Sequence, residues 1–205
     1  MADSCIITIT RQFGSMGRPI ARKAAEELNI PFYDRDIVEQ TAVSMGLPIS
    51  YISKNEENQG GVYAKMKFPL GTSSRKKQDE IFTVQSEIIR QFARQGSCII
   101  VGRCADFVLR DFGNTLNFYI FAPIDKRLEN SVDKLGLDRE TALKMVMGVD
   151  RARNAYREHY AERDLLKGKD CLINSGAFGM DGTVELIVQL FKKWQQNGNN
   201  SNIEL

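Results

Sequence analysis

The sequence ITITRQFGSMGRPIA, residues 7–21, decides how the first part of this 205-residue chain folds. Its first residues belong to an apolar, β-branched run over Cys5–Thr10 that predicts a buried strand. A turn with two glycines follows, and a helical pattern begins near Pro19, whose missing N–H would be unpaired in a first helical turn. A strand, a glycine turn and a helix in this order are typical of a phosphate-binding loop, in which backbone N–H groups and the helix N-terminus hold an anion.

The turn departs from the usual signature of such loops, G-x-x-x-x-G-K-[ST]. If Arg18 takes the place of the lysine, Gln12 replaces the first glycine and Pro19 replaces the hydroxyl that binds magnesium. Arginine can hold a phosphate through its planar fork of donors, but proline cannot ligate a metal. The ligands of any magnesium ion are therefore unknown. The candidates are Thr8, Thr10, Ser15 or a carboxylate from elsewhere.

The turn itself, Gly14-Ser15-Met16-Gly17, can present successive N–H groups to an anion, because glycine permits the backbone angles and the close approach that this requires. We expect the phosphate contacts to come from Gly14, Ser15, Met16, Gly17, Arg18 and Pro19. The alternative interpretation is an ordinary strand–turn–helix connection that binds nothing.

The composition is that of an ordinary globular protein, with 42% apolar and 26% charged residues. The length suits one α/β domain over residues 1–205. A net charge of +2 argues against a general nucleic-acid binder, and no apolar run approaches the ~20 residues that span a bilayer. The N-terminal residues lack the pattern of a signal peptide, so the cytoplasm is the expected compartment.

The cysteines and the single histidine do not suggest a metal site. The four cysteines form no C-x-x-C pair, and His159 is the only histidine, which argues against a zinc site. We expect Cys5, Cys98, Cys104 and Cys171 to be reduced and buried, and His159 to lie on a solvated helix face rather than to act as a base.

Five short apolar runs alternate with helical patterns, which predicts a parallel sheet covered by helices. The predicted strands are Cys5–Thr10, Pro31–Tyr33, Cys98–Val101, Thr115–Phe121 and Cys171–Ile173. The predicted helices cover about Pro19–Leu28, Asp36–Met45, Asp79–Gln95 and Pro123–Lys134, then a stretch that begins near Asp138 and another that begins after Gly182. The amphipathic helix Asp79–Gln95 could serve either the core or a homodimer interface.

Two segments interrupt this alternation. Residues Ser50–Lys77 are rich in glycine and polar residues and read as a mobile loop or a lid element. Residues Asp150–Lys169 carry arginines at positions 151, 153, 157 and 163. The tail from Gln195 is polar and rich in asparagine, and we expect it to be frayed.

Polar residues follow two of the predicted strands, where an α/β sheet places its ligand crevice. Arg103 follows the third strand and could hold a phosphate, or it could be a surface arginine in a salt bridge. Asp34 and Arg35 follow the second strand and would face the same crevice, although Asp34 could simply cap the next helix.

The arginines Arg151, Arg153 and Arg157 lie on or near one helix, and the last two share a face because they are four residues apart. A polyphosphate would offset their mutual repulsion, and arginines of this kind stabilise the charge of a transferred phosphoryl group. The alternative is a solvated face in which they pair with Asp150, Glu158 and Glu162.

Together these pieces resemble the cytidylate-kinase-like family, a divergent branch of the P-loop nucleoside monophosphate kinases. The matching sequences are ITITRQFGSMGR (7–18), PFYDR (31–35), IVGRCA (100–105), DRAR (150–153) through Tyr160, and CLINS (171–175). They span nearly the whole chain in the order that the family shows.

The resemblance implies a three-layer α/β P-loop NTPase fold with a five-stranded parallel sheet in the order 2-3-1-4-5. It also implies an acceptor-binding insertion over about 36–95 and an arginine lid over about 150–169. Residues Gly14 to Arg18 would hold the phosphates of ATP, while Asp34, Arg35 and Arg103 would face the acceptor. Arg18, Arg103, Arg151, Arg153 and Arg157 would be catalytic, and residues 174–178 would lie near the donor base.

The chain departs from that family in its phosphate and metal machinery. Cytidylate kinases have a lysine and a hydroxyl where this chain has Arg18 and Pro19, and an acidic residue where it has Val101. The resemblance implies a nucleotide kinase that uses ATP, with magnesium if other ligands hold it, to phosphorylate CMP, dCMP or a related monophosphate. The alternatives are a catalytically silent nucleotide- or phosphate-binding module and a kinase for another small molecule.

Overall fold

The structure, a computed structural model, describes residues 4–47, 49, 75–161 and 163–198. The elements in chain order are β1 (Ile6–Arg11), α1 (Gly17–Leu28), β2 (Phe32–Tyr33), α2 (Arg35–Met45), α4 (Arg75–Gln95), β3 (Cys98–Val101), α5 (Ala105–Val108), β4 (Thr115–Phe121), α6 (Ile124–Asp133), α7 (Arg139–Tyr160), β5 (Cys171–Asn174) and α8 (Ser175–Gly198).

A five-stranded parallel sheet in the order β2-β3-β1-β4-β5 forms the centre of the molecule, as predicted. The central strand β1 pairs with β3 on one side, where Ile9 is opposite Val101, and with β4 on the other, where Arg11 is opposite Ile120. All strand pairings are parallel, so the carboxyl ends of the strands lie at one edge of the sheet. The candidate residues of β1, β2 and β3 follow these ends.

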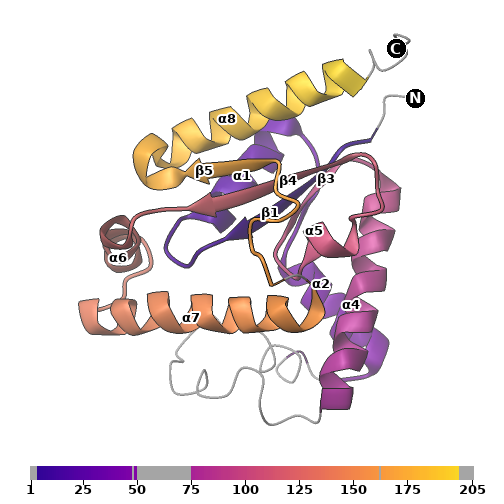
Figure 1. The fold of residues 1–205 in the computed structure, drawn as a ribbon, viewed down its shortest axis with the longest axis horizontal. Coiled ribbons are helices and arrows are strands. Elements are labelled where there is room, and N and C mark those ends of the chain that lie inside the picture. The colour runs from indigo at the N-terminus through magenta and orange to yellow at the C-terminus, as the bar shows by residue number, and fades with distance from the viewer. Residues whose placement is uncertain (1–3, 48, 50–74, 162, 199–205) are drawn as a thin grey trace.

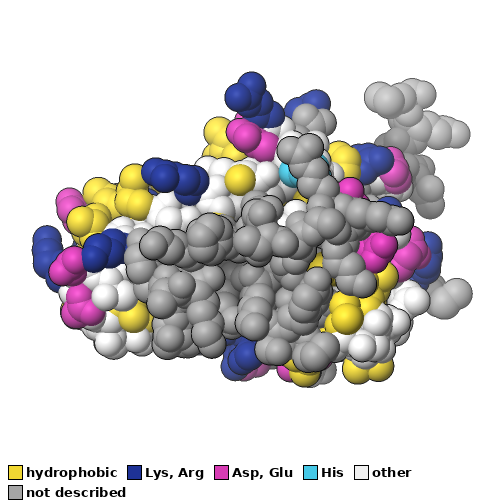
Figure 2. All heavy atoms as spheres, turned by 90° about the horizontal axis from the view of Figure 1, so that it is seen from below, with side chains coloured by type: hydrophobic (Ala, Val, Ile, Leu, Met, Phe, Trp, Pro, Cys, Tyr) yellow, Lys and Arg dark blue, Asp and Glu magenta, His cyan; other side chains and the backbone are white. Residues whose placement is uncertain are grey.

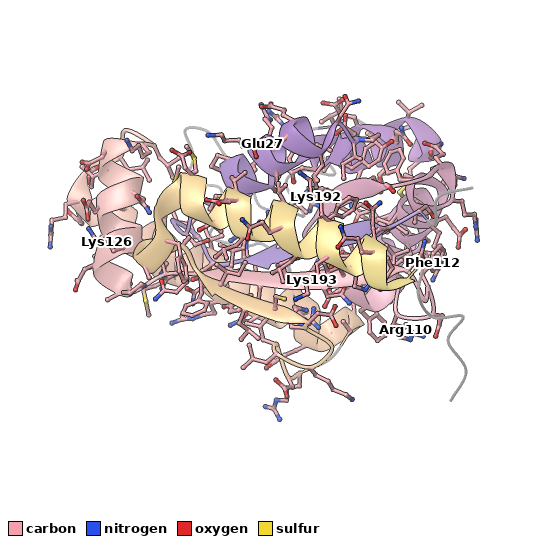
Figure 3. The ribbon with its side chains drawn as sticks, turned by 90° about the horizontal axis from the view of Figure 1, so that it is seen from above. Glu27, Arg110, Phe112, Lys126, Lys192 and Lys193 are labelled. Carbon is pink, nitrogen blue, oxygen red and sulfur yellow. The ribbon has the colours of Figure 1, made fainter. Side chains whose placement is uncertain are left out.

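Helices cover both faces of the sheet, which gives three layers (Figure 1). Successive strand residues point to opposite faces, so Ile7 and Ile9 of β1 pack with α1 and α8. Ile6 faces the other way and joins the cluster of α2, α4 and α5. Figure 3 shows α8 lying over the sheet beside α1, with Lys126 of α6 at one end of the molecule and Arg110 at the opposite end.

A smaller core lies where the chain leaves β1. Phe13 is 7% exposed and packs with Leu128 of α6 and with Val146 and Val149 of α7. The turn after β1 is therefore anchored by an aromatic side chain inside the layer that α6 and α7 form.

The apolar face of α4 is buried within the chain, where Ile88, Ile89 and Phe92 pack against β3 and α5. This face therefore serves the core of the chain. A homodimer remains a prediction. The predicted loop over Ser50–Lys77 falls largely on residues outside the described part, as does the tail beyond residue 198.

The last helix begins earlier than predicted. Helical structure starts at Ser175 and is broken at Gly179, whose φ of 67° and ψ of −177° are not helical. The prediction of a start after Gly182 missed the first turn, because its packing against the turn after β1 involves Ser175 and Ser15, which are far apart in sequence.

The cysteine thiols of the described residues form no disulfide. Cys5, Cys98 and Cys104 are buried, which raises the pKa of each thiol to about 12, and Cys171 is half-buried. His159 is exposed, as expected, and lies 3.4 Å from Asp79. None of the helices in the described ranges is both long and apolar enough to cross a bilayer.

Replacing Gly14 with alanine tests how tightly the turn is held against α6. Gly14 has a φ of +76°, and a methyl group there would lie 2.5 Å from the carbonyl oxygen of Arg127. Overpacking and left-handed strain together should lower the free energy of unfolding by about 2 to 4 kcal/mol, measured by urea denaturation.

Gly46→Ala is the matched control, because Gly46 has a φ of +61° and has no atom within 4 Å of the position of the added methyl. Its free energy of unfolding should fall by only ~1–2 kcal/mol, which is the cost of the backbone strain that the methyl group adds. Equal losses in the two variants would show that Gly14 is not held against α6.

Candidate functional site

The turn between β1 and α1 is held by its carbonyl oxygens. Arg127 donates to the Phe13 carbonyl at 3.3 Å, Asn130 to the Gly14 carbonyl at 2.9 Å, and Ser175 to the Ser15 carbonyl at 2.7 Å. Three consecutive carbonyls are thus bonded to side chains from α6 and α8.

Several backbone N–H groups of the same turn are not bonded to acceptors within the described residues. Within the described residues, the N–H groups of Ser15, Met16 and Gly17 have no hydrogen-bond acceptor. They lie at the N-terminus of α1, where helical N–H groups have no partner inside the helix and the helix dipole is positive. This is the arrangement that binds a phosphate or another oxyanion.

An ion pair that the sequence did not suggest fixes the start of the turn. Asp150 of α7 accepts the Phe13 N–H at 2.8 Å and pairs through its other carboxylate oxygen with Arg127 of α6. The backbone N–H of Gln12 bonds to Ile120, and its side-chain oxygen accepts the Ala122 N–H at 3.2 Å. Gln12, in place of the usual glycine, therefore ties the turn to β4.

Arg18, near the start of α1, and Asp34, which follows β2, form an ion pair. Asp34 occupies the position before the first residue of α2, yet its side chain makes no capping hydrogen bond and contacts Arg18 instead. The simple capping role is therefore wrong. Arg35, the first residue of α2, is exposed.

Unusual backbone angles gather at the two loops of the site. Met16 has a φ of 60°, and Arg103 and Cys104 have φ values of 56° and 52° directly after Gly102 at 78°. A left-handed conformation is unfavourable for residues with a side chain and persists where the surrounding structure enforces it, often at functional sites. The half-buried Arg103 is thus placed by a strained turn at the end of β3.

The three predicted lid arginines lie in three different environments. Arg153 points to the turn and donates to the carbonyl of Arg11 at 3.1 Å. Arg157 is buried and contacts Asp106 of α5 at 2.8 Å. Arg151 is exposed and lines a cavity of about 460 Å³, whose walls also include Arg127 and Asp150. Arg153 and Arg157 share the inward face, as predicted, and Arg151 does not.

In the alternative interpretation these arginines pair with nearby acids, and Asp150 lies near one of them. Arg153 lies 3.8 Å from Asp150, while Arg163 lies 3.6 Å from Glu158. Glu162 falls outside the described residues. Figure 2 shows this side of the molecule, where Lys and Arg side chains lie next to Asp and Glu side chains.

Asp106 connects α5 to two residues of the predicted lid. Its carboxylate contacts Arg157 and Lys169, and all three side chains are less than a tenth exposed. Burial lowers the pKa of Lys169, and the charge of Asp106 opposes that effect. The sequence did not suggest this cluster, because neither cation is close to Asp106 along the chain.

The two positions at which cytidylate kinases carry a hydroxyl and an acidic residue offer no side-chain oxygen to a magnesium ion here. Pro19 has no oxygen in its side chain, and Val101 is fully buried in the apolar core of α1 and α8. The Thr8 hydroxyl donates to Asn117, and the Ser15 hydroxyl donates to the Gln12 carbonyl. No cluster of three acidic, histidine or cysteine side chains suited to a metal occurs within the ranges that the structure describes.

The segment expected near a donor base begins beside the turn. The Ser175 hydroxyl, which bonds to the Ser15 carbonyl, also lies 3.1 Å from the Phe121 carbonyl. Asn174 accepts the Gly176 N–H, and Phe178 is 56% exposed. The end of β5 and the turn after β1 are therefore in direct contact.

Asp106→Asn tests the buried ion cluster. Without the carboxylate charge, Arg157 and Lys169 are two buried cations without a counter-ion, so the free energy of unfolding should fall by about 3 to 5 kcal/mol in urea denaturation. Adding Lys169→Met should recover part of this loss, because it removes one of the two cations.

Asp111→Asn provides the matched control, since its side chain is 84% exposed and lies 3.9 Å from Arg110. This change should alter stability by less than about 0.5 kcal/mol. Equal stabilities of the Asp106 and Asp111 variants would show that the buried contacts contribute nothing.

Comparisons with solved structures agree with this architecture. An uncharacterized protein from Eubacterium ventriosum is 28% identical, with a TM-score of 0.69 over 92% of this chain and 98% of that chain. A shikimate kinase from Bacteroides thetaiotaomicron shares the fold at 9% identity, with a TM-score of 0.54 over 92% of this chain and 98% of its own. A gluconokinase from Sinorhizobium meliloti does so at 10% identity, with a TM-score of 0.56 and coverage of 98% and 99%.

No curated protein matches the sequence. The solved structures therefore establish a P-loop kinase fold without identifying a substrate. The model of the cytidylate kinase-like family matches residues 6–175, which include the turn after β1, the strained turn after β3 and the arginines of α7. The chain therefore belongs to the cytidylate kinase-like family.

Proposed function

We propose that this protein binds a nucleoside triphosphate at the turn after β1 and transfers its γ-phosphate to CMP, dCMP or a related monophosphate. The observation that carries the proposal is the row of N–H groups of Ser15, Met16 and Gly17, which have no acceptor among the described residues while the neighbouring carbonyls are bonded. An oxyanion at the N-terminus of α1 satisfies these donors.

The phosphates of ATP would lie against Gly14–Pro19. Pro19 contributes no N–H and keeps the first turn of α1 in shape, while Arg18 supplies the positive charge that lysine supplies in the usual signature. The ion pair with Asp34 holds Arg18 at the end of β2. When a triphosphate binds, its oxygens could replace the Asp34 carboxylate as the partner of Arg18.

The acceptor would lie between the ends of β2 and β3, where Asp34, Arg35 and Arg103 follow their strands. Its phosphate would already be a nucleophile, so the reaction requires no general base. Positioning and charge neutralisation would then supply the catalysis. We assign the stabilisation of the transferred phosphoryl group to Arg153, which contacts the backbone at the end of β1, while Arg157 pairs with Asp106 and Arg151 lines the cavity beside Asp150.

A catalytically silent nucleotide- or phosphate-binding module is the second candidate. Two observations favour it: the Phe13 N–H is already bonded to Asp150, and the side chains at positions 19 and 101 offer no oxygen to a metal. A kinase for a non-nucleotide small molecule is a third candidate, since shikimate kinase and gluconokinase share the fold.

A coupled ADP-release assay with CMP, dCMP and other nucleoside monophosphates distinguishes these functions. We expect turnover with a cytidine monophosphate, and we expect ATP to raise the melting temperature. Thermal stabilisation by ATP without turnover on any monophosphate would contradict the nucleotide kinase. A further screen with hydroxylated small molecules then separates the silent module from the third candidate.

Arg18→Ala should weaken ATP binding about tenfold or more, because it removes a charged donor at the start of α1. Isothermal titration calorimetry measures the change. Arg22→Ala is the control on the same helix, one turn later, where the guanidinium lies 5.4 Å from the ring centre of Phe32. If both variants bind ATP like the unmodified protein, the phosphate site lies elsewhere.

A further inference from the structure

Arg11, the last residue of the central strand, has a role that the sequence motif does not assign. β1 lies between β3 and β4, so its carboxyl end opens at the middle of the sheet edge. Arg11 continues the series of Ile7 and Ile9, which face α1, and its carbonyl is held by Arg153. Its backbone position is therefore fixed by β4 on one side and by α7 on the other.

Two glycines make room for the side chain of Arg11. A methyl group on Gly17 would lie 2.6 Å from the Arg11 Cβ and 3.1 Å from its Cγ. A methyl group on Gly102 would collide with the guanidinium Nη1 and lie 3.2 Å from Cζ. The side chain therefore starts against the first residue of α1 and ends against the turn after β3.

This path places a cation next to the position at which cytidylate kinases have an acidic residue. Val101, which takes the place of the acid, is buried among apolar side chains, and Gly102 directly follows it. A guanidinium against Gly102 repels a divalent cation and attracts phosphate oxygens. Its fork can donate two parallel hydrogen bonds to one phosphate group.

We infer that Arg11 contacts the phosphates directly and replaces the magnesium ion in binding them, so that the protein binds a triphosphate without a metal. The inference rests on the proposed phosphate site at the turn after β1, and it assigns that site a second cation besides Arg18. A larger residue at position 17 or 102 would displace the Arg11 side chain.

The test is calorimetric titration of the full-length protein with ATP and with inorganic tripolyphosphate, in excess EDTA and in excess magnesium. We expect the unmodified protein to bind equally well in both, within about threefold. Arg11→Gln should weaken binding at least about tenfold in EDTA, because it removes a charge-assisted fork of hydrogen bonds. Arg11→Lys keeps the charge and loses the fork of donors. Its affinity in EDTA should lie between that of the unmodified protein and that of Arg11→Gln.

Two control variants separate this role from general damage. Arg110→Gln removes a half-exposed arginine at the opposite end of the molecule from α6 and should bind like the unmodified protein (Figure 3). Gly102→Ala should weaken binding although it keeps Arg11, whereas Gly46→Ala, at a similar left-handed angle with no neighbour, should not. Circular dichroism checks that each variant folds. If Arg11→Gln does not fold, the affinity of Arg11→Lys and the comparison of EDTA with magnesium test the inference instead.

The outcomes distinguish this inference from the function on which it rests. Unchanged binding by a folded Arg11 variant, or a loss of more than about tenfold when EDTA replaces magnesium, overturns the inference and leaves the phosphate site standing. Failure of the unmodified protein to bind either compound in either condition overturns the proposed function, and the inference with it.

Discussion

The carboxylate of Asp150 is the contact on which the geometry of the site depends. It joins the N–H of Phe13 to the guanidinium of Arg127, so that three separate pieces of chain meet at one carboxylate. The same arginine also reaches the Phe13 carbonyl. Because α6 and α7 are both attached to this group, a shift of either helix would move the turn and the N–H groups that follow it.

The site holds its cations at fixed places through neighbouring acids and backbone carbonyls. Arg18 pairs with Asp34, Arg153 with the carbonyl of Arg11, and Arg157 with Asp106. Such contacts lower the cost of placing several positive charges near one another before a ligand arrives. They also order the arginines in advance, which reduces the side-chain entropy lost when a phosphate binds.

The strands and the layers could be predicted closely because each depends on local patterns. Short apolar runs that read as buried strands are the strands of the sheet, and the predicted start of α7 near Asp138 is correct because the Asp138 side chain accepts the Thr141 N–H. The start of α8 was missed because it depends on Ser175 reaching Ser15 across 160 positions of sequence. The capping role of Asp34 was wrong for the same reason, since Arg18 lies on another element.

The sequence by itself determined the order of the elements, the glycine turn and the departures from the usual phosphate-loop signature, because these depend on residues that are close along the chain. Only the tertiary structure decided which charges meet. It separated Arg151 from Arg153 and Arg157, placed Lys169 and Asp106 together in the interior, and laid Arg11 over Gly17 and Gly102. The physical reason is that a charged side chain takes its partner from whichever element the packing of the core brings alongside it, and no local pattern records that choice.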